Sequence, residues 1–117
     1  MGPGSPLRSG RDDSVRFDAM THETSESIRV WGDATFGEVR NLSALVARAR
    51  GELDELEQAV RANDRPEIGR EAADVVILLH RLVALAGMEL SEQVDAKMAI
   101  NRARKWKPAG DGTGGHV

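Results

Sequence analysis

Two pairs of acidic residues have the spacing of a metal site carried on helices. Glu52 and Glu55 are three residues apart, and so are Glu71 and Asp74. Residues three apart share one face of a helix, so the carboxylates of each pair can point to one place. Four carboxylates offer only oxygen ligands, which suit Mg²⁺, with Mn²⁺ possible, rather than zinc or copper. One carboxylate could also accept a proton from a water that such a metal activates.

Each acidic pair also has a purely structural interpretation. The first pair lies in the acidic run from Glu52 to Glu57, and such runs usually form a solvated helix face. The second pair shares its helix face with Leu78, Leu82 and Leu85. A carboxylate buried among such residues is costly unless a cation or a buried arginine compensates it. The second pair is therefore the stronger indication of a metal site.

A basic set follows the acidic pairs along the chain. Lys97, Asn101 and Arg104 are spaced by four and three residues, so they share a helix face. Lysine and arginine could hold phosphate oxygens, and the asparagine could bond a sugar or a phosphate. The alternative is a solvated basic face that complements the C-terminus of its helix. Together with the acidic pairs, this set indicates phosphate chemistry.

Helical periodicity must position these residues. Apolar residues recur at helical spacing over about 36–61, 64–86 and 91–106, and no segment shows convincing strand alternation. We therefore predict an all-α fold. The middle helix is apolar on nearly every side, which is typical of a central helix. Residues 26–34 could form a short helix or a strand-like arm.

Capping residues mark the expected helix ends. Asp33 or Thr35 could cap the first helix, and Asp64 the second. Gly87 is expected to end the second helix, and Ser91 to begin the third.

The 117 residues favour a single small domain. We expect a tag remnant and flexible lead-in over 1–25, a helical domain over 26–107 and a glycine-rich tail or lid over 108–117. A core of this size is marginal for a lone chain, so we expect a homo-oligomer.

Composition excludes several classes of protein. The chain has no cysteine, so it has neither disulfides nor thiolate metal sites. It shows no apolar run long enough to span a membrane and no signal-peptide pattern, so we expect a cytoplasmic protein without a membrane partner. A net charge of -3 and 3% aromatic residues argue against nucleic-acid binding.

The order and spacing of these motifs are similar to those of a known family. The segments Glu52-Leu-Asp-Glu55, Glu71-Ala-Ala-Asp74 and Lys97 to Trp106 resemble the MazG-like all-α nucleoside triphosphate pyrophosphohydrolases. The stretch from Trp31 to Gly37 and the glycine-rich C-terminus resemble the short, single-domain, dATP/dGTP diphosphohydrolase-like branch.

The resemblance implies a MazG-like helical bundle completed by homo-oligomerisation, as a homodimer or homotetramer whose neighbouring subunits complete each site. It implies hydrolysis of (deoxy)nucleoside triphosphates between the α and β phosphorus atoms, giving the monophosphate and pyrophosphate, in nucleotide-pool control or house-cleaning. It also implies that Mg²⁺ is bound by Glu52, Glu55, Glu71 and Asp74, and the nucleotide by Lys97, Asn101 and Arg104. Gly51 stands where relatives often carry another glutamate, so the number of metal ions and the general base stay open.

Two other functions fit the same sequence. A phosphoribosyl-ATP pyrophosphohydrolase would keep the fold and change the substrate. A non-catalytic helical oligomerisation module would use the apolar stripe of residues 42–60 as a coiled-coil seam. Base recognition does not follow from the motifs. Trp31, Phe36 and Trp106 could stack on a base, but packing in the core is the expected role of each.

Overall fold

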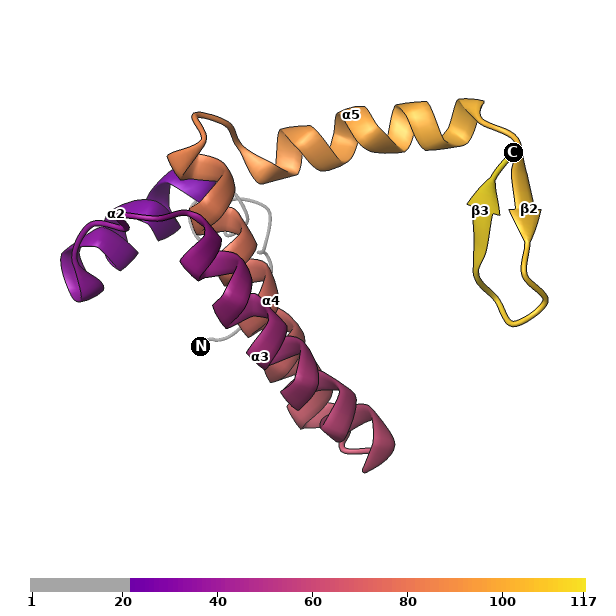
Figure 1. The fold of residues 1–117 in the computed structure, drawn as a ribbon, viewed down its shortest axis with the longest axis horizontal. Helices are drawn as coiled ribbons and strands as arrows, with labels where there is room; N and C mark the ends of the chain where they lie inside the picture. The colour runs from indigo at the N-terminus through magenta and orange to yellow at the C-terminus, as the bar shows by residue number, and fades with distance from the viewer. Residues whose placement is uncertain (1–21) are drawn as a thin grey trace, which may run out of the picture.

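A computed structural model describes residues 22–117, so the tag remnant and most of the lead-in expected over 1–25 lie outside the described residues. The order of elements is α2 (Ser25–Phe36), α3 (Ser43–Arg61), α4 (Arg65–Leu85), α5 (Leu90–Ala103), β2 (Trp106–Pro108) and β3 (Gly114–His116). Figure 1 shows α3 and α4 side by side, α2 across one end of the pair, and α5 leading away to a small hairpin. The fold is mostly helical, as predicted.

The α3–α4 helix pair is the body of the protein. Its turn is tight, and Asn63 adopts a left-handed conformation with φ of 54°. The Glu67 N–H donates to the Asp64 carboxylate at 3.2 Å, which confirms the predicted N-cap. The packed seam is lined by small and branched residues, namely Leu45, Ala49 and Ala59 of α3 and Val75 of α4.

Helix α2 is held against α4 by a buried arginine. Arg81 donates from Nη2 to the Asp33 carboxylate at 3.0 Å and to the Gly37 carbonyl at 2.8 Å. The Arg81 side chain crosses α2 at Gly32, where a Cβ atom would lie only 2.6 Å from the arginine Nε. Glycine at this position therefore leaves the space that the guanidinium group occupies.

A second buried network joins three helices at Ser25, which has no exposed surface. The Ser25 hydroxyl donates to the Glu89 carboxylate at 2.9 Å and accepts the Leu90 N–H at 2.8 Å. The His80 Nδ1 atom lies 2.7 Å from the same oxygen. Because the single hydroxyl proton goes to Glu89, the proton between Ser25 and His80 belongs to Nδ1. This network fixes the start of α5 to α2 and α4.

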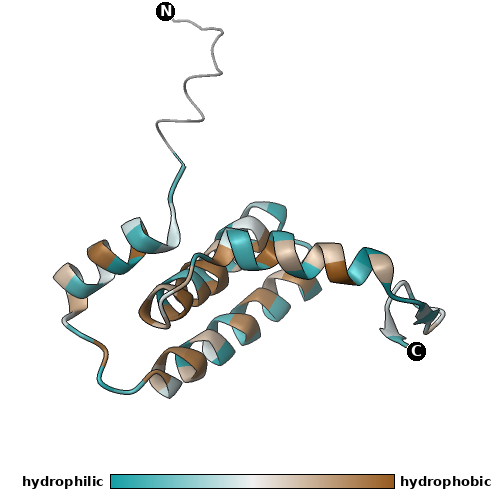
Figure 2. Ribbon diagram, turned by 90° about the horizontal axis from the view of Figure 1, so that it is seen from above, coloured by the Kyte–Doolittle hydropathy of each residue, from teal (hydrophilic) through white to brown (hydrophobic). Residues whose placement is uncertain are grey.

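The rest of α5 has little support from its own chain. None of its residues is buried, and Val94, Met98 and Ile100 are 50%, 38% and 48% exposed. Figure 2 shows hydrophobic and hydrophilic segments alternating along this helix as it leaves the body. Isolated helices of this length are only marginally stable in water, so we expect the apolar positions of α5 to pack against a partner.

The C-terminal segment differs from the prediction. Strand β2 pairs antiparallel with β3, with Trp106 opposite His116 and Pro108 opposite Gly114. The expected tail over 108–117 is therefore one half of a β-hairpin, and the third helix ends at Ala103 rather than near 106. Glycine makes the turn possible, because Gly110 and Gly112 have φ of 98° and 93°.

Other helix ends also differ from the prediction. Residues 26–34 form a helix, and Asp33 and Thr35 lie inside α2 rather than capping the next helix. Helix α2 ends at Phe36 and is followed by Gly37, with φ of 86°, and helix α3 begins only at Ser43. Ser91 lies within α5, whose N-cap is Glu89. Among the described residues, no helix is long and apolar enough to cross a membrane.

Candidate metal centre

Three of the predicted carboxylates converge between α3 and α4. Glu52 and Glu55 lie one turn apart on α3 and face Glu71 of α4. One oxygen from each lies within 4.8 Å of the other two. The tight turn between the helices places these positions opposite one another, so the seam of the helix pair also assembles the cluster.

The environment of Glu71 is unfavourable for a negative charge. Glu71 is only 8% exposed, and its Oε1 atom has no hydrogen-bond partner. Its pKa is raised to about 7, first by a hydrogen bond with the Glu67 carboxyl, then by burial, and then by the charges of Glu55, Glu67 and Glu52. The pKa of Glu67 is instead lowered, first by its hydrogen bond with Arg70. The shared proton therefore resides mainly on Glu71.

This arrangement suits a divalent cation. A buried carboxylate oxygen without a donor, facing two further carboxylates, lacks the positive charge that would stabilise it. An all-oxygen set of this kind matches Mg²⁺ or Mn²⁺. The geometry thus brings together Glu52, Glu55 and Glu71 as candidate ligands, as the sequence predicted.

Asp74 does not share that environment. It lies on α4 one turn beyond Glu71, is exposed, and falls outside the group of converging oxygens. Its expected burial beside Glu71 is wrong, and its role as a ligand stays a prediction. Sequence reasoning missed Glu67, although its position one turn before Glu71 on the same helix face was the available signal.

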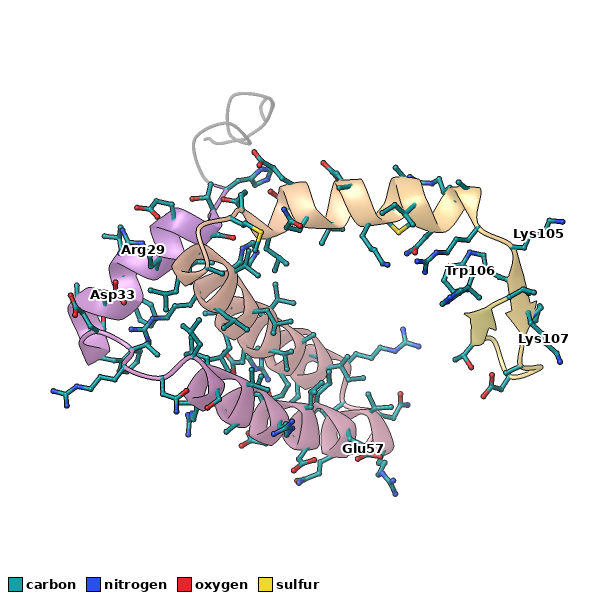
Figure 3. All side chains as sticks on the ribbon, turned by 45° about the horizontal axis from the view of Figure 1, so that its top comes forward. Arg29, Asp33, Glu57, Lys105, Trp106 and Lys107 are labelled. Carbon is teal, nitrogen blue, oxygen red and sulfur yellow. The ribbon has the colours of Figure 1, made fainter. Side chains whose placement is uncertain are left out.

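The predicted nucleotide-binding residues lie elsewhere in the chain. Lys97 and Asn101 are on α5, and Arg104 is the residue that caps its C-terminal end. Lys97 and Arg104 are exposed, while Asn101 is half-buried and its Oδ1 atom has no hydrogen-bond partner. Figures 1 and 3 show this end of the molecule, with Lys105, Trp106 and Lys107 on the hairpin, well away from the α3–α4 body.

One chain therefore does not bring the basic set to the carboxylate cluster. Helix α5 packs lightly on α4 and is fixed mainly at its beginning. The prediction that these residues contact the nucleotide is not tested by the geometry of a single chain.

A pocket of about 340 Å³ lies between α2 and α4, lined by Glu23, Ile28, Trp31 and Ile77. Trp31 is 56% exposed, and Phe36 stands at 89° to it with ring centroids 5.5 Å apart. Phe36 is itself 70% exposed. The expectation that these aromatic rings pack in the core is therefore wrong. Trp106 is also largely exposed, and its indole N–H donates to the Asn101 carbonyl at 2.7 Å.

Comparison with known proteins identifies the family of this bundle. The family model for dATP/dGTP pyrophosphohydrolases matches residues 24–116. The chain belongs to the dATP/dGTP pyrophosphohydrolase family. The predicted resemblance to MazG-like nucleotide pyrophosphohydrolases is thereby confirmed.

Two phage proteins named dATP/dGTP diphosphohydrolase are similar to this chain. The protein of Salmonella phage PMBT28 is 36% identical over 95 residues, which cover 81% of this chain and 31% of that protein. The protein of Cyanophage S-2L is 38% identical over 78 residues, which cover 67% of this chain and 70% of that protein. The chain thus spans less than a third of the first relative.

A solved structure has the same fold. The MazG-like pyrophosphohydrolase of Cyanophage S-2L, bound to dGDP and three catalytic Mn²⁺ ions per active site, has a TM-score of 0.62 and 34% sequence identity. The match covers 80% of this chain and 88% of that chain. A divalent metal in this relative agrees with the carboxylate cluster found between α3 and α4.

Proposed function

We propose that this protein hydrolyses (deoxy)nucleoside triphosphates, purine deoxynucleotides among them, to the monophosphate and pyrophosphate, with Mg²⁺ or Mn²⁺ as cofactor. The convergence of Glu52, Glu55 and Glu71 at the α3–α4 seam, in a chain of this family, carries the proposal. The names of its phage relatives support the substrate class. Control of the nucleotide pool in the cytoplasm is the role we assign to this reaction.

The three glutamates would hold the cation at the seam. When bound, it supplies positive charge for the phosphate oxygens and acidity for a water molecule. Glu67 accepts a hydrogen bond from the protonated Glu71 carboxyl, and it would have to give up this hydrogen bond when a cation displaces the Glu71 proton. We assign Asp74, one turn along α4, as a further ligand.

We also propose that each site is completed by α5 of a second copy of the chain. The exposed apolar positions Val94, Met98 and Ile100 give α5 a surface for such a contact. Charge complementarity supports the arrangement, since the basic residues Lys97 and Arg104 lie in the C-terminal half and at the C-cap of α5, and the carboxylate cluster lies in the body. A homodimer or homotetramer would bring the two together.

Product analysis tests the reaction. Ribo- and deoxyribonucleoside triphosphates are incubated with Mg²⁺, with Mn²⁺ and with chelator, and the products are separated. We expect monophosphate and pyrophosphate in equal amounts, only with metal. Release of inorganic phosphate and a diphosphate, or equal rates in chelator, would refute the proposal.

Mixing two inactive variants tests the shared site. Glu71→Gln removes a cluster residue and Lys97→Ala removes a residue of α5. In a mixed dimer with shared sites, one site carries both changes and the other none, so a remixed sample should regain about one quarter of parent activity. A mixture that stays as inactive as its components places both residues in the same subunit's site.

A further inference from the structure

The pocket between α2 and α4 lies further along α4 than the carboxylate cluster. Ile77, in the pocket wall, is one helical turn beyond Asp74 and six residues beyond Glu71 on α4. Six residues rise about 9 Å along a helix axis, a separation that the sugar and phosphate of a nucleotide together can span. Each step of three residues also turns about 60° around the helix, so Asp74 and then Ile77 lead from the side of α4 that carries the cluster to the side that faces the pocket.

The chemistry of the pocket wall suits a flat ring with polar edges. Ile28, Trp31 and Ile77 provide an apolar lining, and the Trp31 indole is oriented by its perpendicular contact with Phe36. Stacking on an aromatic ring favours any base and does not distinguish between bases. Discrimination must therefore come from a polar group in the lining, and Glu23 is the charged residue there.

Glu23 is held with one oxygen free. The Ser27 hydroxyl donates to Glu23 Oε1 at 2.7 Å, and Ser27 is itself fixed by the capping box with Thr24. Among residues 22–117, no hydrogen bond to Glu23 Oε2 is present. A carboxylate only accepts hydrogen bonds, so it selects a ligand edge that carries donors.

We propose that Glu23 is a specificity-determining residue that makes the pocket prefer guanine to adenine. Guanine presents two adjacent donors on one edge, the N1–H and the 2-amino group, and both can point to a carboxylate. Adenine presents an acceptor at N1 and a single amino group, so it leaves the carboxylate facing a lone pair. A site built to accept hydrogen bonds rejects a ligand that cannot donate them. This inference rests on the proposed function, which supplies the nucleotide substrate whose base the pocket would bind.

Kinetics with three purine nucleotides tests the assignment. We expect kcat/KM to fall from dGTP to dITP, which lacks the 2-amino group, and further to dATP. Glu23→Gln should lower kcat/KM for dGTP by about ten- to a hundredfold, the range for losing hydrogen bonds to a charged group, and leave dATP unchanged or improved. Glu26→Gln is the matched control, because Glu26 pairs with Arg29 outside the pocket lining.

Binding without turnover separates this inference from the proposed function. The chain has two tryptophans, so Trp106→Phe leaves Trp31 as the only indole. Quenching of its fluorescence by dGMP should occur at lower concentration than by dAMP, and Glu23→Gln should abolish the difference. Equal quenching by both nucleotides, or a Glu23→Gln variant that keeps the guanine preference, overturns the assignment. A guanine preference in binding with no hydrolysis of any triphosphate would support the assignment of the pocket and refute the proposed reaction.

Discussion

Metal binding to this protein should release a proton, and the amount should follow the titration of Glu71. With its pKa raised to about 7, Glu71 holds a proton that a bound cation must displace. The titration curve gives release of about 0.9 protons at pH 6, 0.5 at pH 7 and 0.1 at pH 8 from this one group. Below the pKa, the apparent dissociation constant for the metal should weaken about tenfold per pH unit.

Isothermal titration calorimetry of Mn²⁺ in buffers of different ionisation enthalpy measures this release directly. The slope of observed enthalpy against buffer ionisation enthalpy is the number of protons released. Glu67→Gln should move the profile to lower pH, because the hydrogen bond with Glu67 is the largest cause of the raised pKa. Glu57→Gln is the control, since Glu57 pairs with Arg61 on the surface of α3.

Two results would refute this reasoning. Proton release near zero at pH 6 would show that Glu71 is ionised before the metal arrives. A release profile unchanged by Glu67→Gln would show that the shared hydrogen bond does not hold the proton.

The raised pKa of Glu71 also determines whether the stability of the metal-free protein rises or falls with pH. The folded-state pKa of Glu71 is raised from 4.5 to about 7, so the folded protein keeps the proton at pH values where the unfolded chain has lost it. Its contribution to stability is therefore complete below about pH 4.5 and lost as pH rises through about 7. Saturating Mn²⁺ should remove this decline, because it binds the ionised carboxylate of the folded state.

Three further predictions concern single residues. Glu55→Gln should reduce metal-dependent turnover at least a hundredfold in product assays, whereas Glu57→Gln on the same helix should keep parent rates; equal loss in both would show that charge rather than ligation matters. Gly32→Ala should lower the free energy of unfolding by about 1–3 kcal/mol in denaturant titrations, because the new methyl group meets Arg81, and an unchanged midpoint would mean that the arginine moves aside. Ser25→Ala should cost about 1–3 kcal/mol, since it leaves the Leu90 N–H without its acceptor, and parent-like unfolding would show that water replaces the hydroxyl.

Much of the fold and of the site could be predicted from local patterns. Helical periodicity and the Asp64 cap are properties of adjacent residues, so the sequence predicts α4 to within a residue or two. Helix geometry alone predicts that Glu52 and Glu55, three residues apart, share one face. The structure confirms that both face Glu71. Family motifs then supply the enzyme class.

The predictions that failed concern features that depend on contacts between residues distant in the sequence. The exposure of Asp74 depends on how far α3 and α2 cover α4, which helix periodicity does not specify. The hairpin at the C-terminus depends on pairing between Trp106 and His116 across a glycine-rich turn, and strands of three residues are too short for alternation to appear. Trp31 was expected in the core because of its residue type, yet α2 lies across the end of the helix pair and leaves it exposed.

The contact between Gly32 and Arg81 has a consequence for how this sequence can change. The guanidinium group occupies the volume that any other side chain at position 32 would need. A larger residue at position 32 alone clashes with Arg81, and a smaller apolar residue at position 81 alone removes one of the two arginine partners of Asp33 without using the space it frees. A larger residue at 32 is therefore accommodated only together with a smaller residue at 81. In laboratory evolution of this protein, these two positions should therefore drift together, and a neutral path between alternative pairs should be rare.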